Sequence, residues 1–160
     1  MSVESLVLVA NRLPLAWSPN DGWTRSPGGL VTAVEPVARR TGMTWIGRAG
    51  DDVWPTLPSL PGCRLASPAV GVEGLGADTL CNRTLWPALH GIEPAIAWSE
   101  PWWDDYQASN RAFADVVVEH APDGATVWIH DYHLLLLPGL LRGQEPRRRV
   151  LAAERRDLRP

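Results

Sequence analysis

Two short apolar runs, far apart in the chain, constrain the fold most strongly. Residues 6–10 and 126–130 are rich in β-branched side chains and lack the alternation of apolar and polar residues that is typical of a surface strand. Such runs are typical of strands that are buried on both faces of a parallel sheet. Residues 30–40 and 102–120 have apolar side chains at helical spacing. Strands alternating with helices predict an α/β fold with a Rossmann-like parallel sheet, in which residues 6–10 form the central strand.

The other elements are less clearly marked in the sequence. Residues 43–46 and 64–66 are predicted strands, and residues 134–142 are predicted to be helical despite Pro138. The polar segment that follows the first strand and ends at Pro27 is expected to be a loop. Residues 48–76 are rich in Pro and Gly, and apart from the strand at 64–66 they predict no helix or strand. We therefore expect one domain, whose core is set by the clear strands and helices.

Composition favours a globular protein. The chain has 160 residues, 45% of them hydrophobic, and nine Trp, which is enough to bury one core. No run approaches the roughly 18 apolar residues of a membrane span, and the first ten residues do not resemble a secretory signal, so we expect a cytoplasmic protein that binds no membrane. Cys63 and Cys81 lack the spacing and the neighbours of metal ligands, and no metal is predicted.

The last 18 residues differ in charge from the rest. Residues 143–160 carry six Arg against three acidic residues, whereas residues 1–142 carry nine Arg against fifteen. A basic segment can bind nucleic acid, but acidic residues are interspersed among these Arg. We therefore predict a solvated tail or helix end that binds no nucleic acid.

Charged residues that could bind a ligand follow the predicted strands at 6–10 and 126–130. Arg12 follows the first strand, and Asp131 follows the later one in the sequence His-Asp-Tyr-His. Ligands of open parallel sheets bind beyond the carboxyl ends of the strands, so Arg12 could bind a phosphate and Asp131 could accept hydrogen bonds from sugar hydroxyls. Equally, Arg12 could pair with an acidic residue and Asp131 could cap the following helix. The residues alone leave these alternatives open.

Two further signals are weak when taken singly. Gly28 and Gly29 precede a predicted helix, where exposed amide groups and the helix dipole favour an oxyanion, although a plain tight turn explains them as well. Trp86 could stack on a sugar ring, but most tryptophans are core residues. His133 could likewise be a packed or surface histidine.

Four ordered blocks nevertheless resemble the trehalose-6-phosphate synthases, which are retaining glycosyltransferases of the two-domain GT-B fold. They are Val-Ala-Asn-Arg-Leu-Pro at 9–14, Ser-Pro-Gly-Gly-Leu-Val-Thr-Ala at 26–33, Leu-Trp-Pro-Ala-Leu-His at 85–90, and Trp-Ile-His-Asp-Tyr-His followed by four Leu and a Pro at 128–138. The family helix that begins with Trp and continues with Tyr, Asn and Phe is matched by Trp103, Tyr106, Asn110 and Phe113. The resemblance spans residues 5–142 and implies the acceptor-side, amino-terminal GT-B domain.

The resemblance also implies a reaction and a set of roles. The family transfers glucose from UDP-glucose to glucose 6-phosphate with retention, giving trehalose 6-phosphate without a metal or other cofactor. By resemblance, Arg12 binds the acceptor phosphate, Trp86, Asp131 and His133 shape and hold the acceptor, and Gly28 and Gly29 admit the donor diphosphate. No side chain is expected to act as a nucleophile.

The sequence departs from the family pattern in three places. The family has a Tyr-Tyr pair followed by Phe-Ser-Asn where residues 76–82 of this chain read Gly-Ala-Asp-Thr-Leu-Cys-Asn, so that only Asn82 matches and Gly or Ala replaces the Tyr residues. The family's Trp-x-Gly-Trp block here reads Trp-Ile-Gly-Arg, ending at Arg48. Residues 143–160 contain none of the family's continuation into a second domain. We therefore expect a truncated domain 1–142 with an unrelated tail 143–160, inactive alone. The uncovered face and edge of a truncated sheet predict self-association. The alternative is a non-catalytic sugar-phosphate-binding subunit, or a split-enzyme subunit that a separate carboxyl-terminal half completes.

Overall fold

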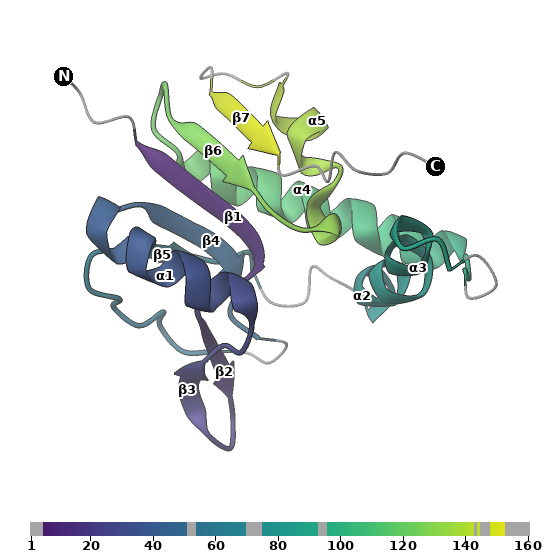
Figure 1. The fold of residues 1–160 in the computed structure, drawn as a ribbon, viewed down its shortest axis with the longest axis horizontal. Helices are drawn as coiled ribbons and strands as arrows, with labels where there is room; N and C mark the ends of the chain where they lie inside the picture. Colours follow the sequence, from purple (N-terminus) through teal and green to yellow (C-terminus); the bar gives the residue numbers. More distant parts are fainter. Residues whose placement is uncertain are drawn as a thin grey trace.

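The fold is built on a parallel sheet. The computed structural model describes residues 5–50, 54–69, 75–92, 96–142, 144 and 148–152. Five strands pair in the order β5-β4-β1-β6-β7, and every pairing is parallel (Figure 1). The strands are β1 (Leu6–Arg12), β4 (Thr44–Arg48), β5 (Arg64–Ala66), β6 (Thr126–Ile129) and β7 (Arg149–Ala152). The predicted α/β sheet, with the first strand at its centre, is therefore confirmed.

Helices cover both faces of this sheet. Helix α1 (Gly29–Thr41) packs on one face, and α4 (Glu100–His120) and α5 (Leu137–Arg142) pack on the other (Figure 1). The side chains of β1 alternate between the two cores: Leu8 is buried against α1, whereas Val9 is buried against α4. Burial on both faces explains why the strand sequence shows no apolar–polar alternation.

A third apolar cluster forms where α2 (Leu75–Leu80) packs on the amino-terminal half of α4. A π-helical turn (Cys81–Leu85) and α3 (Trp86–Leu89) continue from α2, in a segment for which the sequence predicted no element. Burial raises the pKa of the Cys81 thiol to about 12, with further raising by neighbouring carboxylates. This thiol is therefore protonated at neutral pH and acts as a small apolar core side chain.

The region predicted to be a loop before Pro27 contains a hairpin. Strands β2 (Leu15–Ser18) and β3 (Gly22–Arg25) pair antiparallel, with Trp17 opposite Trp23 and their ring centroids 5.6 Å apart. Strands of four residues are too short to show a clear period, and the cross-strand aromatic contact stabilises the pair.

The predicted helix at 134–142 is shorter than expected. A 3-10 turn (Tyr132–Leu134) precedes α5, which begins only at Leu137. Pro138 is the second residue of α5, where a missing backbone N–H costs nothing, so the proline marks the beginning of a helix and not its interior.

Part of the predicted tail belongs to the sheet. Val127 pairs with Val150, and the register continues along β6 and β7. The expectation of a solvated tail is therefore wrong for Arg149–Ala152, because a run of Val, Leu and Ala after the arginines adds a strand at the sheet edge. Residues 143, 145–147 and 153–160 of that segment lie outside the described residues.

Candidate functional site

A cavity of about 330 Å³ lies at the carboxyl ends of β1 and β6. Residues from the loop before α1, from α2 and from the segment after β6 complete its wall. They are Ala10, Asn11, Arg12, Pro27, Gly28, Leu30, Val31, Asp78, Asn82, Asp131, Tyr132 and His133. Arg12 and Asp131 therefore border one cavity, as the parallel neighbouring strands predicted.

Arg12 is the exposed cation of this cavity. Its backbone is fixed by packing, because the Trp45 indole donates a hydrogen bond to the Arg12 carbonyl at 3.2 Å. Within the described part of the chain, the Arg12 guanidinium makes no ion pair with a carboxylate. The alternative in which Arg12 pairs with an acidic residue of the described chain is therefore wrong, and Arg12 lines the cavity.

Asp131 has an unusual backbone conformation. It is the one described non-glycine residue with a positive φ, 86°. Such conformations cost about 1–3 kcal/mol and are concentrated at functional sites. Asp131 precedes the 3-10 turn at its N-cap position, but no capping hydrogen bond from its side chain is present. The capping alternative therefore does not explain this residue.

His133 holds the Asp131 carboxylate. The His133 Nδ1 atom lies 2.9 Å from Asp131 Oδ1. Burial raises the pKa of Asp131, but the hydrogen bond and the charge of His133 outweigh it, and the pKa lies below the ordinary carboxyl value. Asp131 is therefore an anion at neutral pH and accepts hydrogen bonds from hydroxyl groups.

Helix α4 fixes the backbone of this loop. The Tyr106 hydroxyl donates to the Tyr132 carbonyl at 2.9 Å and accepts from the Leu135 N–H at 3.1 Å. The Asn110 side chain donates to the His133 carbonyl at 3.0 Å. The family-like helix residues thus act on the site through the loop segment that directly follows the strained Asp131.

A second cation lies beside Arg12. Arg12 and Arg48 are partners in the β1–β4 register, and Arg48 is 9% exposed. Arg48 donates from Nη2 to Asp78 Oδ1 at 2.6 Å and from Nε to Asn11 Oδ1 at 3.0 Å. Asp78 Oδ1 also lies 3.8 Å from His133 Nε2. Charged and polar groups from β1, β4, α2 and the loop after β6 are therefore linked.

The glycines predicted to bind phosphate lie at the start of α1. Gly28 has φ 132°, a conformation that L-residues rarely adopt, and it lines the cavity. Gly29 is the first residue of α1 and is not among the lining residues. The amino end of α1 thus borders the cavity that contains Arg12, which brings a helix dipole to the same place.

Trp86 is not brought to this cavity. It lines a neighbouring hollow of about 560 Å³ with Arg83, Pro87, Ile92, Ile96 and Ala97, and Asn82 lines both. The Trp86 ring stacks on His90 with centroids 4.3 Å apart. The sugar-stacking role of Trp86 stays a prediction.

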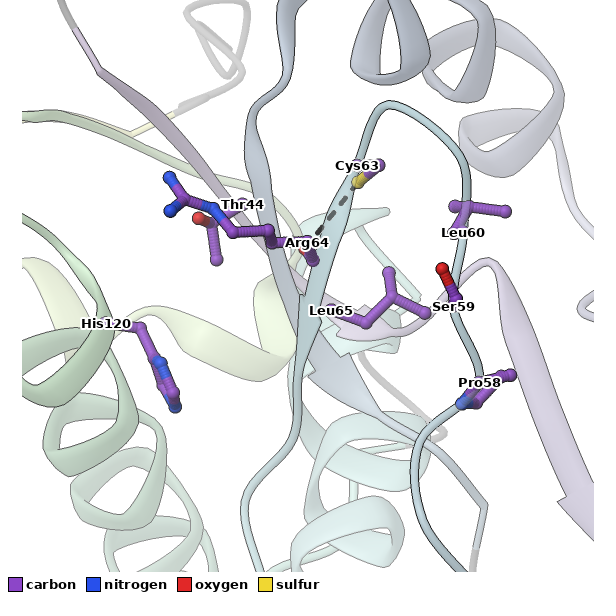
Figure 2. A pocket seen from close by; sticks show the side chains of 8 residues that line it. All are labelled: Thr44, Pro58, Ser59, Leu60, Cys63, Arg64, Leu65 and His120. Carbon is purple, nitrogen blue, oxygen red and sulfur yellow. Dashed lines mark hydrogen bonds between the residues drawn. The ribbon is translucent and has the colours of Figure 1, made fainter.

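Figure 2 shows another cavity, of about 390 Å³, which lies at the amino ends of β4 and β5. Thr44 and Arg64, the first residues of β4 and β5, line it with His120 at the end of α4. Because the strands are parallel, this cavity and the Arg12 cavity border opposite ends of the sheet. It is therefore separate from the candidate site.

The described residues contain neither a metal-binding cluster nor a membrane-spanning helix. No group of three His, Cys, Asp or Glu side chains is placed to hold a metal ion in the ranges that the structure describes. No helix in those ranges has the length and apolar character that a bilayer span requires.

Sequence reasoning missed part of the cavity wall. Asn11 directly precedes Arg12 at the end of a predicted strand, so its position could have been predicted. Asp78 and Tyr132 also line the cavity. Asp78 lies in a segment with no predicted element, and nothing in its local sequence indicated a partner 30 residues earlier.

We expect His130 to make the stability of the fold depend on pH. His130 is half-buried, its Nε2 has no hydrogen-bond partner in the described residues, and burial lowers its pKa, although Asp131 opposes this. As the pH falls, His130 is therefore protonated in the unfolded chain at a higher pH than in the folded chain. The stability that neutral His130 contributes is complete above about pH 6.5, and it is lost as the pH falls toward the lower pKa of the folded state.

Urea unfolding between pH 7.5 and 5 measures this dependence. The His130→Gln variant should lose stability less steeply over that range than the native chain. Equal slopes for the two proteins would contradict the assignment to His130.

Comparisons with known proteins agree with this geometry. Residues 73–151 match the model of glycosyltransferase family 20. A trehalose-6-phosphate synthase of Mycolicibacterium smegmatis is 40% identical in an alignment of 152 residues, and the match covers 89% of this chain and 30% of the relative. The chain thus spans about 30% of the length of the curated relatives that it matches.

Solved structures share the fold. The E. coli trehalose-6-phosphate protein with UDP-2-fluoro glucose bound is 26% identical and superposes with a TM-score of 0.73, over 92% of this chain and 32% of that one. A Burkholderia xenovorans alpha,alpha-trehalose-phosphate synthase in complex with glucose-6-phosphate has a TM-score of 0.72 at 24% identity, over 92% of this chain and 33% of that one. The region shared with each is about one third of the larger protein.

Proposed function

We propose that this chain belongs to glycosyltransferase family 20, corresponds to the amino-terminal portion of its trehalose-6-phosphate synthases, and provides the acceptor side of such an enzyme. The reaction is the transfer of glucose from UDP-glucose to glucose 6-phosphate, giving trehalose 6-phosphate. The single observation that carries the proposal is the cavity that Arg12 and Asp131 share.

The cavity suits a phosphorylated hexose. A guanidinium can bind a phosphate through two parallel hydrogen bonds, and Arg12 has no carboxylate partner among the described residues. Asp131, kept ionised by His133, accepts hydrogen bonds from sugar hydroxyls. A ligand held at both ends is fixed in orientation, which is how positioning contributes to a transfer reaction.

The donor would approach from the amino end of α1. Gly28 has no side chain to obstruct a diphosphate, and the helix dipole favours an anion there. The transfer proceeds with retention and without metal, and no side chain of this chain attacks the sugar. The charge that develops on the departing diphosphate needs further cations, which by resemblance belong to the second domain of the family. We therefore expect no glucosyl transfer from the isolated chain, and we place the protein in the cytoplasm.

Titration of the chain with glucose 6-phosphate, glucose and UDP-glucose tests the proposal. We expect saturable heat or chemical-shift changes with glucose 6-phosphate, and a much weaker response to glucose, which lacks the group for Arg12. Cavity-lining residues should show the largest shifts. A folded chain that does not respond to glucose 6-phosphate at millimolar concentration would contradict the proposal.

A non-catalytic sugar-phosphate subunit is not favoured, since the relatives that the chain matches are synthases. Mixing the chain with a separately produced second domain of a relative tests the split-enzyme form. Recovered glucosyl transfer would establish the split enzyme. The result of this mixing experiment does not change how the titration with glucose 6-phosphate is interpreted.

A further inference from the structure

The cavity at the amino ends of β4 and β5 has a lining that the proposed function leaves unused. Figure 2 shows Pro58, Leu60 and Leu65 on one side of it and a group of polar side chains on the other. An arginine and a histidine belong to the lining, whereas no acidic residue does. In a chain whose formal net charge is -3, a hollow with a guanidinium and no carboxylate favours an anion.

Three of the polar side chains reach the cavity on the same face of the sheet. Side chains alternate between the two faces along a strand, and Ile46 and Ala66 are buried in the cluster that packs against α4. Thr44 and Arg64 lie two residues before them and are register partners, so both point to the α4 face. His120 is the last residue of α4 and lines the same cavity. The fold therefore brings a hydroxyl, a guanidinium and an imidazole together from three elements.

The hydroxyl of Thr44 has no protein partner. Thr44 is 4% exposed and lines the cavity, yet its side chain makes no hydrogen bond with any residue that the structure describes. Buried hydroxyls are normally hydrogen-bonded, so one that stays unpaired at a cavity wall is available to a bound ligand. This hydroxyl contributes to the cavity and not to the hydrogen bonds that hold the sheet.

The Arg64 guanidinium is also uncompensated. It makes no ion pair with a carboxylate in the described ranges, and Figure 2 shows the side chain directed past Thr44 on the side where His120 lies. The His120 Nε2 atom lies 3.9 Å from Glu119 Oε2, but that carboxylate is 73% exposed, so water screens the contact. A guanidinium fork together with a hydroxyl and an imidazole can donate to several oxygens of one group.

We propose that this cavity is a second ligand site, which binds a tetrahedral oxyanion, the phosphate group of a small ligand, through Thr44, Arg64 and His120. Its volume of about 390 Å³ lies within the range of small-molecule sites, roughly 300–1,000 Å³. The apolar side of the cavity contacts the body of the ligand. The site lies at the opposite end of the sheet from the Arg12 cavity, so this proposal does not depend on the proposed function.

Titration with inorganic phosphate, followed by the chemical shifts of the backbone amides, tests the proposal. We expect saturable shifts at Thr44, Arg64 and Leu65. Acetate, which is planar, should shift these amides less at the same ionic strength, and equal affinity for acetate would contradict a site for tetrahedral oxyanions. The Arg12 cavity is expected to bind phosphate too, so the signals are assigned residue by residue. Arg12→Gln should leave the midpoint at Arg64 unchanged.

The Arg64→Gln variant measures the contribution of the guanidinium. We expect phosphate to bind about tenfold more weakly, because a charge-assisted hydrogen bond is lost. Arg40→Gln is the matched control. It removes the same charge from the last turn of α1, at the same end of the sheet but outside the cavity, and should leave the affinity unchanged.

The Thr44→Val variant separates binding from folding. Valine keeps the branched shape and removes the hydroxyl, so phosphate should bind about threefold more weakly or worse. The urea midpoint should stay unchanged or rise, because the lost hydroxyl has no partner in the described chain. Thr126→Val, at the buried first residue of β6 and outside the cavity, should leave phosphate binding as it is. A Thr44 with a purely structural role would not combine weaker binding with an undiminished midpoint.

Two results would overturn the second site. One is a folded native chain whose Thr44, Arg64 and Leu65 amides do not respond to phosphate at millimolar concentration. The other is an Arg64→Gln chain that binds phosphate at these amides as tightly as the native chain. Neither result bears on glucose 6-phosphate in the Arg12 cavity, because the signals of that cavity come from other residues.

Discussion

Replacement of Arg12 by Gln should weaken the binding of glucose 6-phosphate about 10- to 100-fold, because the ligand loses a charge-assisted hydrogen bond worth about 1.5–3 kcal/mol. Arg12 is exposed in the cavity and is the cation there without a carboxylate partner in the described residues. Its removal should leave the fold intact, since its side chain carries no ion pair that stabilises the described structure. Calorimetric titration measures the affinity.

Two companion variants make this result specific. Arg40→Gln removes the same charge from the exposed last turn of α1 and should not change the affinity. Arg12→Lys keeps the charge but loses the planar fork, so it should bind with intermediate affinity. An Arg12→Gln chain that binds glucose 6-phosphate as tightly as the native chain would overturn the role of this residue.

Gly47→Ala should destabilise the fold and impair the site together. A Cβ atom at Gly47 would lie 2.5 Å from the Arg12 carbonyl carbon and 2.6 Å from the Leu13 nitrogen, which is closer than real Cβ contacts. The backbone of β1 must therefore move where it positions Arg12. Overpacking of this kind costs about 1–3 kcal/mol. We expect a lower urea midpoint and a weaker response to glucose 6-phosphate.

Gly139→Ala is the matched control, because it adds the same methyl group within α5 where no atom lies within 4 Å. It should be neutral or slightly stabilising, since Ala is favoured over Gly in helices. If Gly47→Ala has the same urea midpoint as the native chain and binds glucose 6-phosphate with the same affinity, the close approach of β4 and β1 does not constrain Arg12.

The sheet and its main helices could be predicted because their signals are local and repeated. β1 and β6 contain short, largely buried runs, and the buried residues of α4 recur at helical spacing from Tyr106 to Val117. The short elements could not be predicted. β2 and β3 have four residues each, and the Trp17–Trp23 contact that stabilises them forms only after the chain turns.

The candidate site was predictable only where it follows a predicted strand. Arg12 lies two residues beyond the first predicted strand and Asp131 directly follows the later one, and the parallel pairing of neighbouring strands brings their carboxyl ends together. The Arg48–Asp78 pair could not be found in this way, because its geometry depends on how α2 packs against α4. The place of Trp86, which lines a neighbouring hollow, could not be predicted either. Its helix α3 follows a π-helical turn that no residue pattern marks.

The order of the strands has a consequence for biosynthesis. β1 is made first, yet one of its two partners, β6, emerges from the ribosome only after Thr126 has been added. At about 5–20 residues per second, that delay is on the order of ten seconds. Throughout it, β1 can pair with β4 alone, and the face that later receives Phe113 and Val117 stays uncovered. We therefore expect nascent chains of this protein to need chaperone protection until α4 and β6 have been translated, and we expect this long-range closure to limit the folding rate.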